Sequence, residues 1–362
     1  MKKLGCLLKK NSTKIANICL VCLFVLFFVL VLIFQYDIQF LANGFPKLAE
    51  KNLQVYYLDV GQASATFVIL PTGRTLLIDT GSGESEREFL QSVDKILKTN
   101  KLSKIDKLIL THSDEDHVGG AVGLFKKYQV DACYRPKVIS TSAFEEEKPE
   151  YKKIESAVFE QVISSAYTEP DCEVEFIENE IFVEGDCVVE IFACKEDVYN
   201  DTNSYCPFVT IFYGGKQFMF CGDATKVREE EFVSDMKTEE RKMDVDFLLV
   251  SHHGSKSSTT EDFLSYISPR YAIISAGDSL HPTQTVIDRL TESGVSEIFC
   301  TKTDGMIAIG VNASGTFEVK TMSVFVDLPL FVCIIFVVGA VWQVYFVQRR
   351  SGRKFSLSHE NM

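Results

Sequence analysis

Two histidines and three acidic residues fall within six consecutive positions of this sequence, from His112 to His117. Acidic side chains crowded into one turn repel one another unless a cation gathers them. Imidazole nitrogens and carboxylate oxygens are ligands that zinc, manganese and iron accept in proteins. The order His-x-Asp-x-Asp-His, followed by Gly119 and Gly120, therefore favours a metal site over a solvated acidic loop.

The elements on either side of this cluster are expected to hold it at the edge of a β-sheet. Residues 106–110 form a short apolar run that predicts a buried strand, and residues 118–127 predict a helix. The polar cluster would then lie at the carboxyl end of a strand, where open α/β sheets bind their ligands.

Further polar residues follow other predicted strands. Asp79 follows the strand at 75–78, Asp223 follows that at 217–221, His252 and His253 follow that at 246–250, and His281 comes after that at 271–275. Five of the six histidines lie in these turns or in the first cluster. A single histidine is more often a core residue, but five of them beside carboxylates favour one shared site.

Hydrophobic periodicity predicts the rest of the fold. Further strands are expected at 54–60, 65–70, 187–193 and 208–213 and near Ile298, Ile307 and Phe317, and helices around Leu90, Phe232, Phe263 and Leu290. Residues from about 140 to 180 are acidic and weakly periodic. They are expected to form a variable insertion that could line the substrate cleft.

Two segments, residues 15–34 and 324–347, are apolar enough to predict transmembrane helices, since a span of about 30 Å needs about 20 apolar residues. A cleaved signal peptide is less consistent with the first segment, because no small-residue cleavage site follows it. Basic residues flank the outer end of both segments. The positive-inside rule then predicts a two-pass protein of the cell membrane, with both termini cytoplasmic and the catalytic domain extracellular.

The charge distribution limits the substrates that this domain would attract. The formal net charge is −13, and the two basic tails carry +5 and +3, which leaves −21 for the rest of the chain. Such a field repels polyanions unless a local basic patch or bound metal ions offset it. Seven cysteines lie between the two apolar segments, and their number and spacing leave their pairing open.

Several of these motifs together resemble the metallo-β-lactamase fold. They are Asp59-Val60-Gly61-Gln62, Leu77-Ile78-Asp79-Thr80-Gly81, the cluster from Thr111 to Gly120, Gly222-Asp223-Ala224 and His252-His253-Gly254-Ser255. In this order and spacing they resemble the exterior C-terminal domain of the ComEC competence family, over about residues 54–320. The chain departs from that family in having two predicted membrane spans where a multi-span channel is expected.

The resemblance implies an α/β fold, an αββα sandwich, with two divalent metal ions. His112 and Asp114 would bind one ion, Asp116 and His117 the other, and Asp223 would bridge them. His253 or His252 would complete the set, with His253 preferred, while Asp79 would support the site. In the wider fold a further histidine ligand precedes the bridging aspartate; this chain has none there, and Asn203 or a neighbour is the candidate replacement, unless one ion binds weakly. Zinc is expected, with manganese as the alternative because of the oxygen-rich donors.

The implied chemistry is hydrolysis of a phosphodiester. A carboxylate-bridged pair of cations makes hydroxide available at neutral pH and clamps the attacking and leaving oxygens. Asp116, His252 and His281 are the expected catalytic residues, the two histidines by stabilising charge or protonating the leaving group.

The resemblance implies a nuclease that acts on DNA outside the membrane. A phosphodiesterase for a cell-envelope polymer or headgroup and a non-catalytic surface scaffold remain the alternatives. Expected partners are DNA or another phosphodiester, membrane lipid and a separate channel protein. The expected layout is a basic tail (1–14), a first span (15–34), a linker (35–53), the hydrolase domain (54–320), a second span (324–347) and a basic tail (348–362).

Overall fold

A computed structural model describes residues 22–23, 25–27, 45–46, 48–49, 52–140, 150–277, 280–322 and 339. The chain divides into two units, and the strands and helices discussed below belong to the unit Phe45–Ser323. The domain predicted at 54–320 lies within this unit, and the exact boundaries of all six predicted segments stay predictions.

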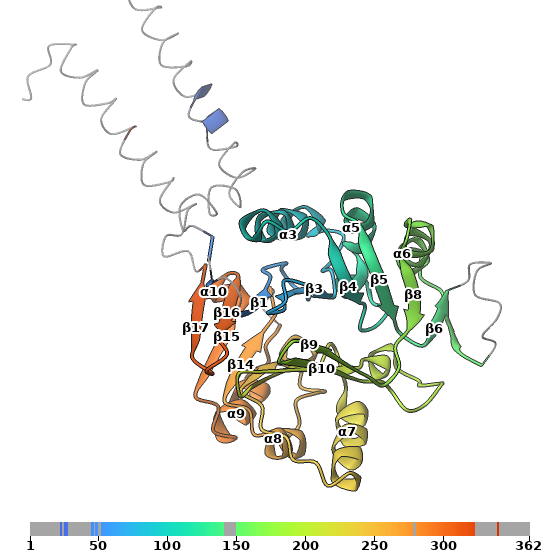
Figure 1. The fold of residues 1–362 in the computed structure, drawn as a ribbon, viewed down its shortest axis with the longest axis vertical. Coiled ribbons are helices and arrows are strands. Elements are labelled where there is room, and N and C mark those ends of the chain that lie inside the picture. Colours follow the sequence, from blue (N-terminus) through green and yellow to red (C-terminus); the bar gives the residue numbers. More distant parts are fainter. Residues whose placement is uncertain are drawn as a thin grey trace, which may run out of the picture. The chain divides into compact units, whose positions relative to one another are not determined.

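Two mixed β-sheets lie face to face in this unit (Figure 1). The first contains, in spatial order, β17 (Phe317–Thr321), β16 (Ile307–Val311), β1 (Leu53–Tyr57), β2 (Thr66–Ile69), β3 (Thr75–Ile78), β4 (Ile105–Ile109), β5 (Val130–Arg135) and β8 (Glu173–Phe176). The second contains β15 (Glu297–Cys300), β14 (Tyr271–Ile274), β13 (Phe247–Leu249), β12 (Lys216–Phe220), β11 (Phe208–Tyr213), β10 (Cys187–Phe192) and β9 (Glu180–Glu184). A separate pair joins β6 (Val138–Ser140) and β7 (Lys152–Ile154).

Helices cover the outer face of each sheet (Figure 1). The first sheet carries α3 (Glu86–Asn100), α5 (Ala121–Lys127) and α6 (Ala157–Thr168), and the second carries α7 (Lys226–Thr238), α8 (Glu261–Ile267) and α9 (Gln284–Glu292). Four single turns complete the fold, namely α4 (Glu115–Val118), η2 (Thr202–Tyr205), η3 (Ser251–Gly254) and α10 (Thr301–Asp304). The predicted αββα sandwich is therefore confirmed.

Alternation of side chains along the strands builds two apolar layers, because successive residues of a strand point to opposite faces. On β12, Phe218 and Phe220 belong to the core between the two sheets, whereas Met219 packs with the residues of α7 and α8. On β13, Phe247 and Leu249 face the other sheet and Leu248 faces the helices. These strands are therefore buried on both of their faces, which explains why they are nearly continuous apolar runs in the sequence.

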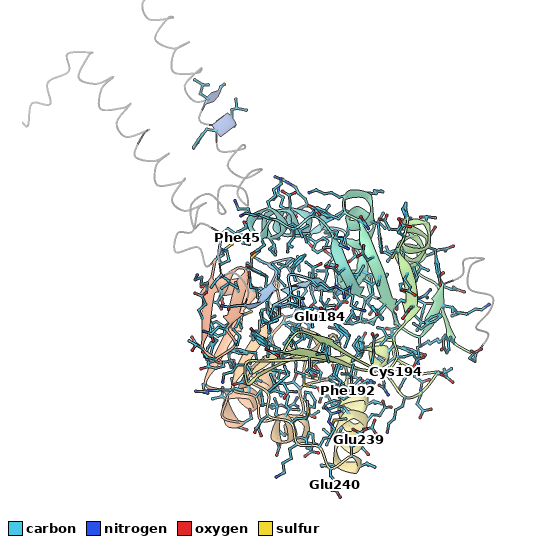
Figure 2. All side chains as sticks on the ribbon, viewed as in Figure 1. Phe45, Glu184, Phe192, Cys194, Glu239 and Glu240 are labelled. Atoms are coloured by element: carbon cyan, nitrogen blue, oxygen red, sulfur yellow. The ribbon has the colours of Figure 1, made fainter. Side chains whose placement is uncertain are left out.

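An aromatic group connects the two sheets. The ring of Phe247 on β13 lies 4.6 Å from that of Phe218 and 5.2 Å from that of Tyr271, both in the second sheet. It also meets the edge of Phe317, on β17 of the first sheet, at 5.2 Å. At the surface, Glu184 at the end of β9 (labelled in Figure 2) pairs with Arg74, in the turn before β3, at 2.7 Å.

In each sheet, one side consists of four parallel strands, and the site residues follow strands of this side. In the first sheet β3, β4, β5 and β8 run parallel, and in the second β12, β13, β14 and β15 do so. The carboxyl ends of parallel strands lie at the same edge of a sheet. Polar residues that follow different strands therefore meet at this edge even when they are far apart in the sequence.

The weakly periodic region from 140 to 180 is more regular than the sequence predicts. Helix α6 begins after Ser156, whose hydroxyl accepts the N–H of Phe159 at 3.2 Å, and it buries Phe159, Val162 and Ile163. Strand β8 then joins the first sheet beside β5. The acidic residues around these elements masked their apolar spacing. Residues 141–149 of the proposed insertion lie outside the described residues.

The helix predicted at 118–127 is divided in two. Residues of the metal cluster themselves form α4, and α5 starts only at Ala121. Gly119 and Gly120 separate α4 from α5. Backbone of a neighbouring loop lies so close to both positions that a side chain would not fit.

The predicted two-pass location in the cell membrane is contradicted. In the part of the chain that the structure describes, no helix is long and apolar enough to cross a bilayer. The longest described helix with defined ends, α3, has 15 residues and carries charges along it, whereas a span needs about 20 predominantly apolar residues. Apart from residues 22–23, 25–27 and 339, the segments 15–34 and 324–347 lie outside the described residues.

The cysteines that the structure describes are free thiols, so the pairing that the sequence left open does not occur among them. Five of those within the unit, Cys133, Cys187, Cys194, Cys206 and Cys221, are buried. The described fold is therefore stabilised by apolar packing and hydrogen bonds rather than by disulfides.

Replacement of Phe247 by alanine tests the aromatic contact between the sheets. We expect the free energy of unfolding to fall by about 3–5 kcal/mol, because a fully buried ring is lost and a cavity remains. Phe212→Ala on β11 is the matched control, since that ring is 46% exposed and its loss should cost about 1 kcal/mol or less. Urea unfolding measures both; equal losses would contradict this account of the core.

Candidate metal centre

The predicted site residues come from strand ends of both sheets. Asp79 follows β3 and His112 follows β4 in the first sheet, while Asp223 follows β12 and His253 follows β13 in the second. One ligand atom from each of Asp116, His117, Asp223 and His253 can be chosen so that all four lie within 4.8 Å of one another. These four residues, called the four-residue cluster below, therefore join the two sheets at one edge of the sandwich.

The single turn α4 presents two of these ligands. It begins directly after Asp114 and carries Asp116 and His117 at adjacent positions. The glycines that follow permit close backbone packing. A Cβ atom at Gly120 would lie 2.3 Å from the carbonyl oxygen of Thr80, and one at Gly119 equally close to the backbone nitrogen of Gly83. The Gly-Gly pair in the motif is thus required by the loop that carries Asp79.

A buried carboxylate orients His117. Asp79 is 1% exposed and has a left-handed backbone with φ of 60°. Its Oδ1 accepts the N–H of Thr111 and its Oδ2 accepts the hydroxyl of the same residue, both at 2.8 Å. Oδ2 also accepts Nδ1–H of His117 at 2.7 Å. This contact turns the other ring nitrogen, Nε2, toward the four-residue cluster.

His253 is oriented in the same manner by a backbone carbonyl. Its Nδ1 donates to the carbonyl oxygen of Ser275, which follows β14, at 2.7 Å. His252 and His253 both have φ of 53° in the turn η3, a conformation that costs a non-glycine residue free energy. Such strain persists only where surrounding contacts fix the backbone. Here the strained turn directs Nε2 of His253 toward the four-residue cluster.

The arrangement of nitrogens and oxygens fits a divalent cation. Nε2 of His117 and Nε2 of His253 lie 3.3 Å apart, although Nδ1 of each ring already donates elsewhere. Two neutral rings would therefore point their lone pairs at each other. Oδ1 of Asp223 lies 3.0 Å from Nε2 of His117, and Oδ2 of Asp116 lies 3.3 Å from Nε2 of His253. A cation bound by these atoms removes the repulsion.

The pKa values of the cluster show the same demand for positive charge. Burial alone disfavours the charged form of His117, but the charges of Asp223 and Asp79 outweigh it and raise the pKa of this histidine well above its usual value. Burial likewise opposes ionisation of Asp223, yet His117 and His253 hold its pKa well below the usual range. Without a metal, a proton supplies the positive charge that these carboxylates require.

His112 and Asp114 lie next to the four-residue cluster rather than in it. Nδ1 of His112 lies 3.1 Å from the hydroxyl of Thr111, and its Nε2 lies 3.9 Å from Oδ2 of Asp114. His112 is fully buried, and burial, together with the charge of His117, lowers its pKa to about 4. Burial raises the pKa of the Asp114 carboxyl, so this side of the site differs electrostatically from the first.

Two further histidines lie at the rim of the site. Nε2 of His252 is 3.6 Å from Oδ2 of Asp223, and its side chain is 27% exposed. The ring of His281 lies parallel to that of His252, with the ring centres 6.5 Å apart. His281 therefore neighbours His252 and does not belong to the four-residue cluster.

A loop between β1 and β2 ties both sheets together beside the site. The N–H of Ser64 donates to the carbonyl of Asp116 at 3.1 Å, and the carbonyl of Ala63 accepts the hydroxyl of Ser275 at 2.8 Å. Gln62 Oε1 accepts the N–H of Gly277 at 3.0 Å. Elements that carry His117 and His253 are thus held by one short segment.

Comparison with protein families identifies the fold. A model of the metallo-β-lactamase superfamily matches residues 58–278, more than half of the chain. The chain belongs to the metallo-β-lactamase superfamily. The match covers both halves of the site described above; the fold implies binding of divalent metal ions, and the four-residue cluster is the candidate site.

The curated relatives are competence and recombination proteins. ComE operon protein 3 of Bacillus subtilis is 29% identical over 299 residues, 78% of this chain and 36% of the relative. Recombination protein 2 of Haemophilus influenzae is 29% identical, covering 64% and 25%, and competence protein ComA of Neisseria gonorrhoeae is 24% identical, covering 74% and 33%. The resemblance to the ComEC family is thereby confirmed, and the chain spans about a third or less of each relative.

Solved structures of the superfamily are also similar. The metallo-β-lactamase fold protein YhfI of Bacillus subtilis is 12% identical with a TM-score of 0.45, covering 74% of this chain and 99% of the other. Tm1679, a metal-dependent hydrolase of the β-lactamase superfamily, is 12% identical with a TM-score of 0.43, covering 74% and 98%.

Sequence reasoning found the ligand-type residues of the site and the supporting Asp79, and it missed Thr111 and Ser275. Thr111 bonds Asp79 and lies beside His112, and Ser275 holds His253 through its main-chain carbonyl. Thr111 adjoins the histidine motif and Ser275 ends a predicted strand, so their positions were available as a signal. Their roles could not be predicted, because every residue type has a backbone carbonyl and the sequence does not show which carbonyl meets His253.

Asp79→Asn tests the orientation of His117. An amide offers one acceptor oxygen where three donors now converge, so we expect zinc affinity to fall by about 10–100-fold. Zinc competition with a chromophoric chelator measures this change. Asp106→Asn is the matched control, because Asp106 accepts the N–H and hydroxyl of Thr75 at the opposite end of the same two strands. Unchanged affinity in the Asp79 variant would refute the assigned role.

Asp59 predicts a pH dependence of stability. Burial, supplemented by the charge of Glu88 and opposed by the N–H of Gly61, raises the pKa of Asp59 from 3.8 to about 6. The folded state then binds more protons than the unfolded state between these two values, so stability falls as pH rises from about 4 to 6 and is level above.

Removing this carboxyl should remove that slope. We expect Asp59→Asn to gain roughly 2–3 kcal/mol relative to the unmodified chain between pH 4 and pH 7, in metal-free protein. Urea unfolding at successive pH values measures the difference. The exposed Asp186→Asn is the control, and parallel pH profiles for the Asp59 variant and the unmodified chain would contradict the shift.

Proposed function

We propose that this chain is a metal-dependent phosphodiesterase, and that it acts as a nuclease on DNA. The four-residue cluster of Asp116, His117, Asp223 and His253 is the observation that carries the proposal. Membership of the metallo-β-lactamase superfamily supports hydrolysis as the reaction class. The names of the curated relatives, which refer to competence and recombination, support DNA as the substrate class.

The chain's own residues would hold two divalent ions in unequal surroundings. Asp116, His117 and His253 would bind one, His112 and Asp114 the other, and Asp223, whose two oxygens approach different histidines, would contact both. Zinc or manganese suits these donors. When bound, such ions supply a nucleophilic water at neutral pH and neutralise charge on the phosphoryl oxygens.

Residues around the cluster would then position the substrate and manage protons. Asp79 and the carbonyl of Ser275 keep the two imidazoles fixed, so that the ligand geometry is present before a substrate binds. His252 is the partly exposed group nearest Asp223, and we assign it the proton transferred to the leaving oxygen. His281, parallel to His252, would stabilise charge at the same rim.

Within the phosphodiester class, DNA has one serious competitor as the substrate. The charge of −21 on the chain without its basic tails opposes a long polyanion more than a small diester. This observation favours, as second candidate, a phosphodiester of a cell-envelope polymer or headgroup. A non-catalytic scaffold is the third candidate, and the oriented set of metal-type ligands argues against it. A separate channel protein remains a proposed partner of the nuclease.

Cleavage assays on the purified 362-residue chain test the proposal. We expect single-stranded DNA and bis-p-nitrophenyl phosphate to be hydrolysed with zinc or manganese, and Asp116→Ala and Asp223→Ala each to lose about 100-fold or more of this activity. The exposed Asp288→Ala on α9 is the control. DNA cleavage should weaken steeply with added salt.

The pattern of results separates the candidates. Loss of DNA cleavage in both variants supports the nuclease. Cleavage of the small diester alone transfers the assignment to an envelope phosphodiester. Absence of metal-dependent turnover of either substrate contradicts phosphodiesterase activity altogether.

A further inference from the structure

The turn η2 lies between the two sides of the site. The side chain of Thr202 lies close to the carboxylate of Asp114 and favours its charged form. The hydroxyl of Ser204 lies 3.3 Å from that of Thr225, two residues after Asp223. Immediately after the turn, Sγ of Cys206 accepts the N–H of Asp223 at 3.2 Å. Contacts at both ends therefore fix η2 against the residues that hold Asp114 and Asp223.

Asn203 occupies the middle of this turn and is 8% exposed. Its N–H donates to Oδ1 of Asp201 at 3.0 Å, and its carbonyl accepts the N–H of Cys206 at 3.2 Å. The backbone of Asn203 is thus satisfied. The side-chain oxygen Oδ1 is buried, and no hydrogen-bond partner for it exists among the described residues. A buried amide oxygen without a partner is rare in a folded protein and calls for an explanation.

A second buried atom, on the ring of His112 beside Asp114, has the same deficiency. Nε2 of His112 has no hydrogen-bond partner in the described part of the chain, and it lies 3.9 Å from Oδ2 of Asp114. Asp114 is thus close both to His112 and to Thr202, the neighbour of Asn203. The amide oxygen of Asn203 carries no proton, and Nε2 of His112 carries none when Nδ1–H donates to Thr111, whose own hydroxyl donates to Asp79, so a cation can be the partner of each atom.

We infer that Asn203 donates its side-chain oxygen to the second divalent cation, together with His112 and Asp114. The inference rests on the metal-binding part of the proposed function and deepens it. The sequence left the choice between Asn203, a neighbour and a weakly bound ion open. The two neighbours are already engaged, Thr202 with Asp114 and Ser204 with Thr225, which leaves Asn203.

This assignment makes the two metal positions chemically unequal. The first has two imidazoles, from His117 and His253, a donor set that suits zinc. The second has one imidazole and oxygens from Asp114, Asn203 and Asp223, a harder set that suits manganese. With zinc at the first position, the second position should therefore accept manganese when no further zinc is present, since zinc would otherwise compete for both positions.

A sequential titration of the metal-free 362-residue chain tests this inference. One equivalent of zinc is added first, and manganese is then titrated while its free concentration is read from the six-line electron paramagnetic resonance signal of the aqueous ion. We expect one manganese ion per chain to bind. In Asn203→Ala the zinc equivalent should be retained, and manganese affinity should fall by about tenfold or more.

Two substitutions at the same position sharpen the result. Asn203→Asp keeps an oxygen ligand and should retain manganese, whereas Asn203→His should allow a second zinc ion to bind tightly. Asn200→Ala, an exposed asparagine in the same segment, should match the unmodified chain. Retention of the first zinc and an unchanged melting curve show that each variant is folded.

Two outcomes would overturn the inference: manganese binding in Asn203→Ala equal to that of the unmodified chain, or an unmodified chain that binds a single divalent ion. Because no DNA or diester is present in the titration, the nuclease proposal and this inference can fail independently.

Discussion

The site depends on a buried series of hydrogen bonds that fixes which nitrogen of each imidazole faces the centre. Asp79 and the carbonyl of Ser275 occupy Nδ1 of His117 and His253, and the two Nε2 atoms are left facing each other at 3.3 Å. The close glycine contacts after α4 and the bonds of the loop at Ser64 all serve this arrangement. A cation resolves the conflict that the fold creates, and metal binding is therefore built into the backbone as well as the side chains.

Strain at the site is offset by packing elsewhere. Asp79, His252 and His253 each have a positive φ, a conformation that costs roughly 1–3 kcal/mol for a non-glycine residue. The inter-sheet core, in which Phe247 contacts rings of both sheets, stabilises the strand ends from which these residues project. The apolar sandwich thus holds a polar edge that could not persist alone, and it does so without any disulfide among the described cysteines.

Local patterns in the sequence were sufficient for most of the fold. Strands such as β4 and β13 are short apolar runs ending in polar turns, so their type and approximate limits follow from periodicity. Helix α6 was missed because acidic neighbours conceal the spacing of Phe159, Val162 and Ile163. The predicted membrane location rested on hydropathy and on flanking basic residues, and the described helices do not provide a span.

The sequence by itself determined which residues could bind metal, since residue type and strand-end position are local properties of the chain. Tertiary structure alone decided which of them meet. His117 and His253 are 136 positions apart, and only the packing of two sheets brings their nitrogens within 3.3 Å. It also separated His281 from the four-residue cluster and left Asn203 with an unsatisfied oxygen. The physical reason is that ligand geometry comes from long-range packing and backbone hydrogen bonds, which no short stretch of sequence encodes.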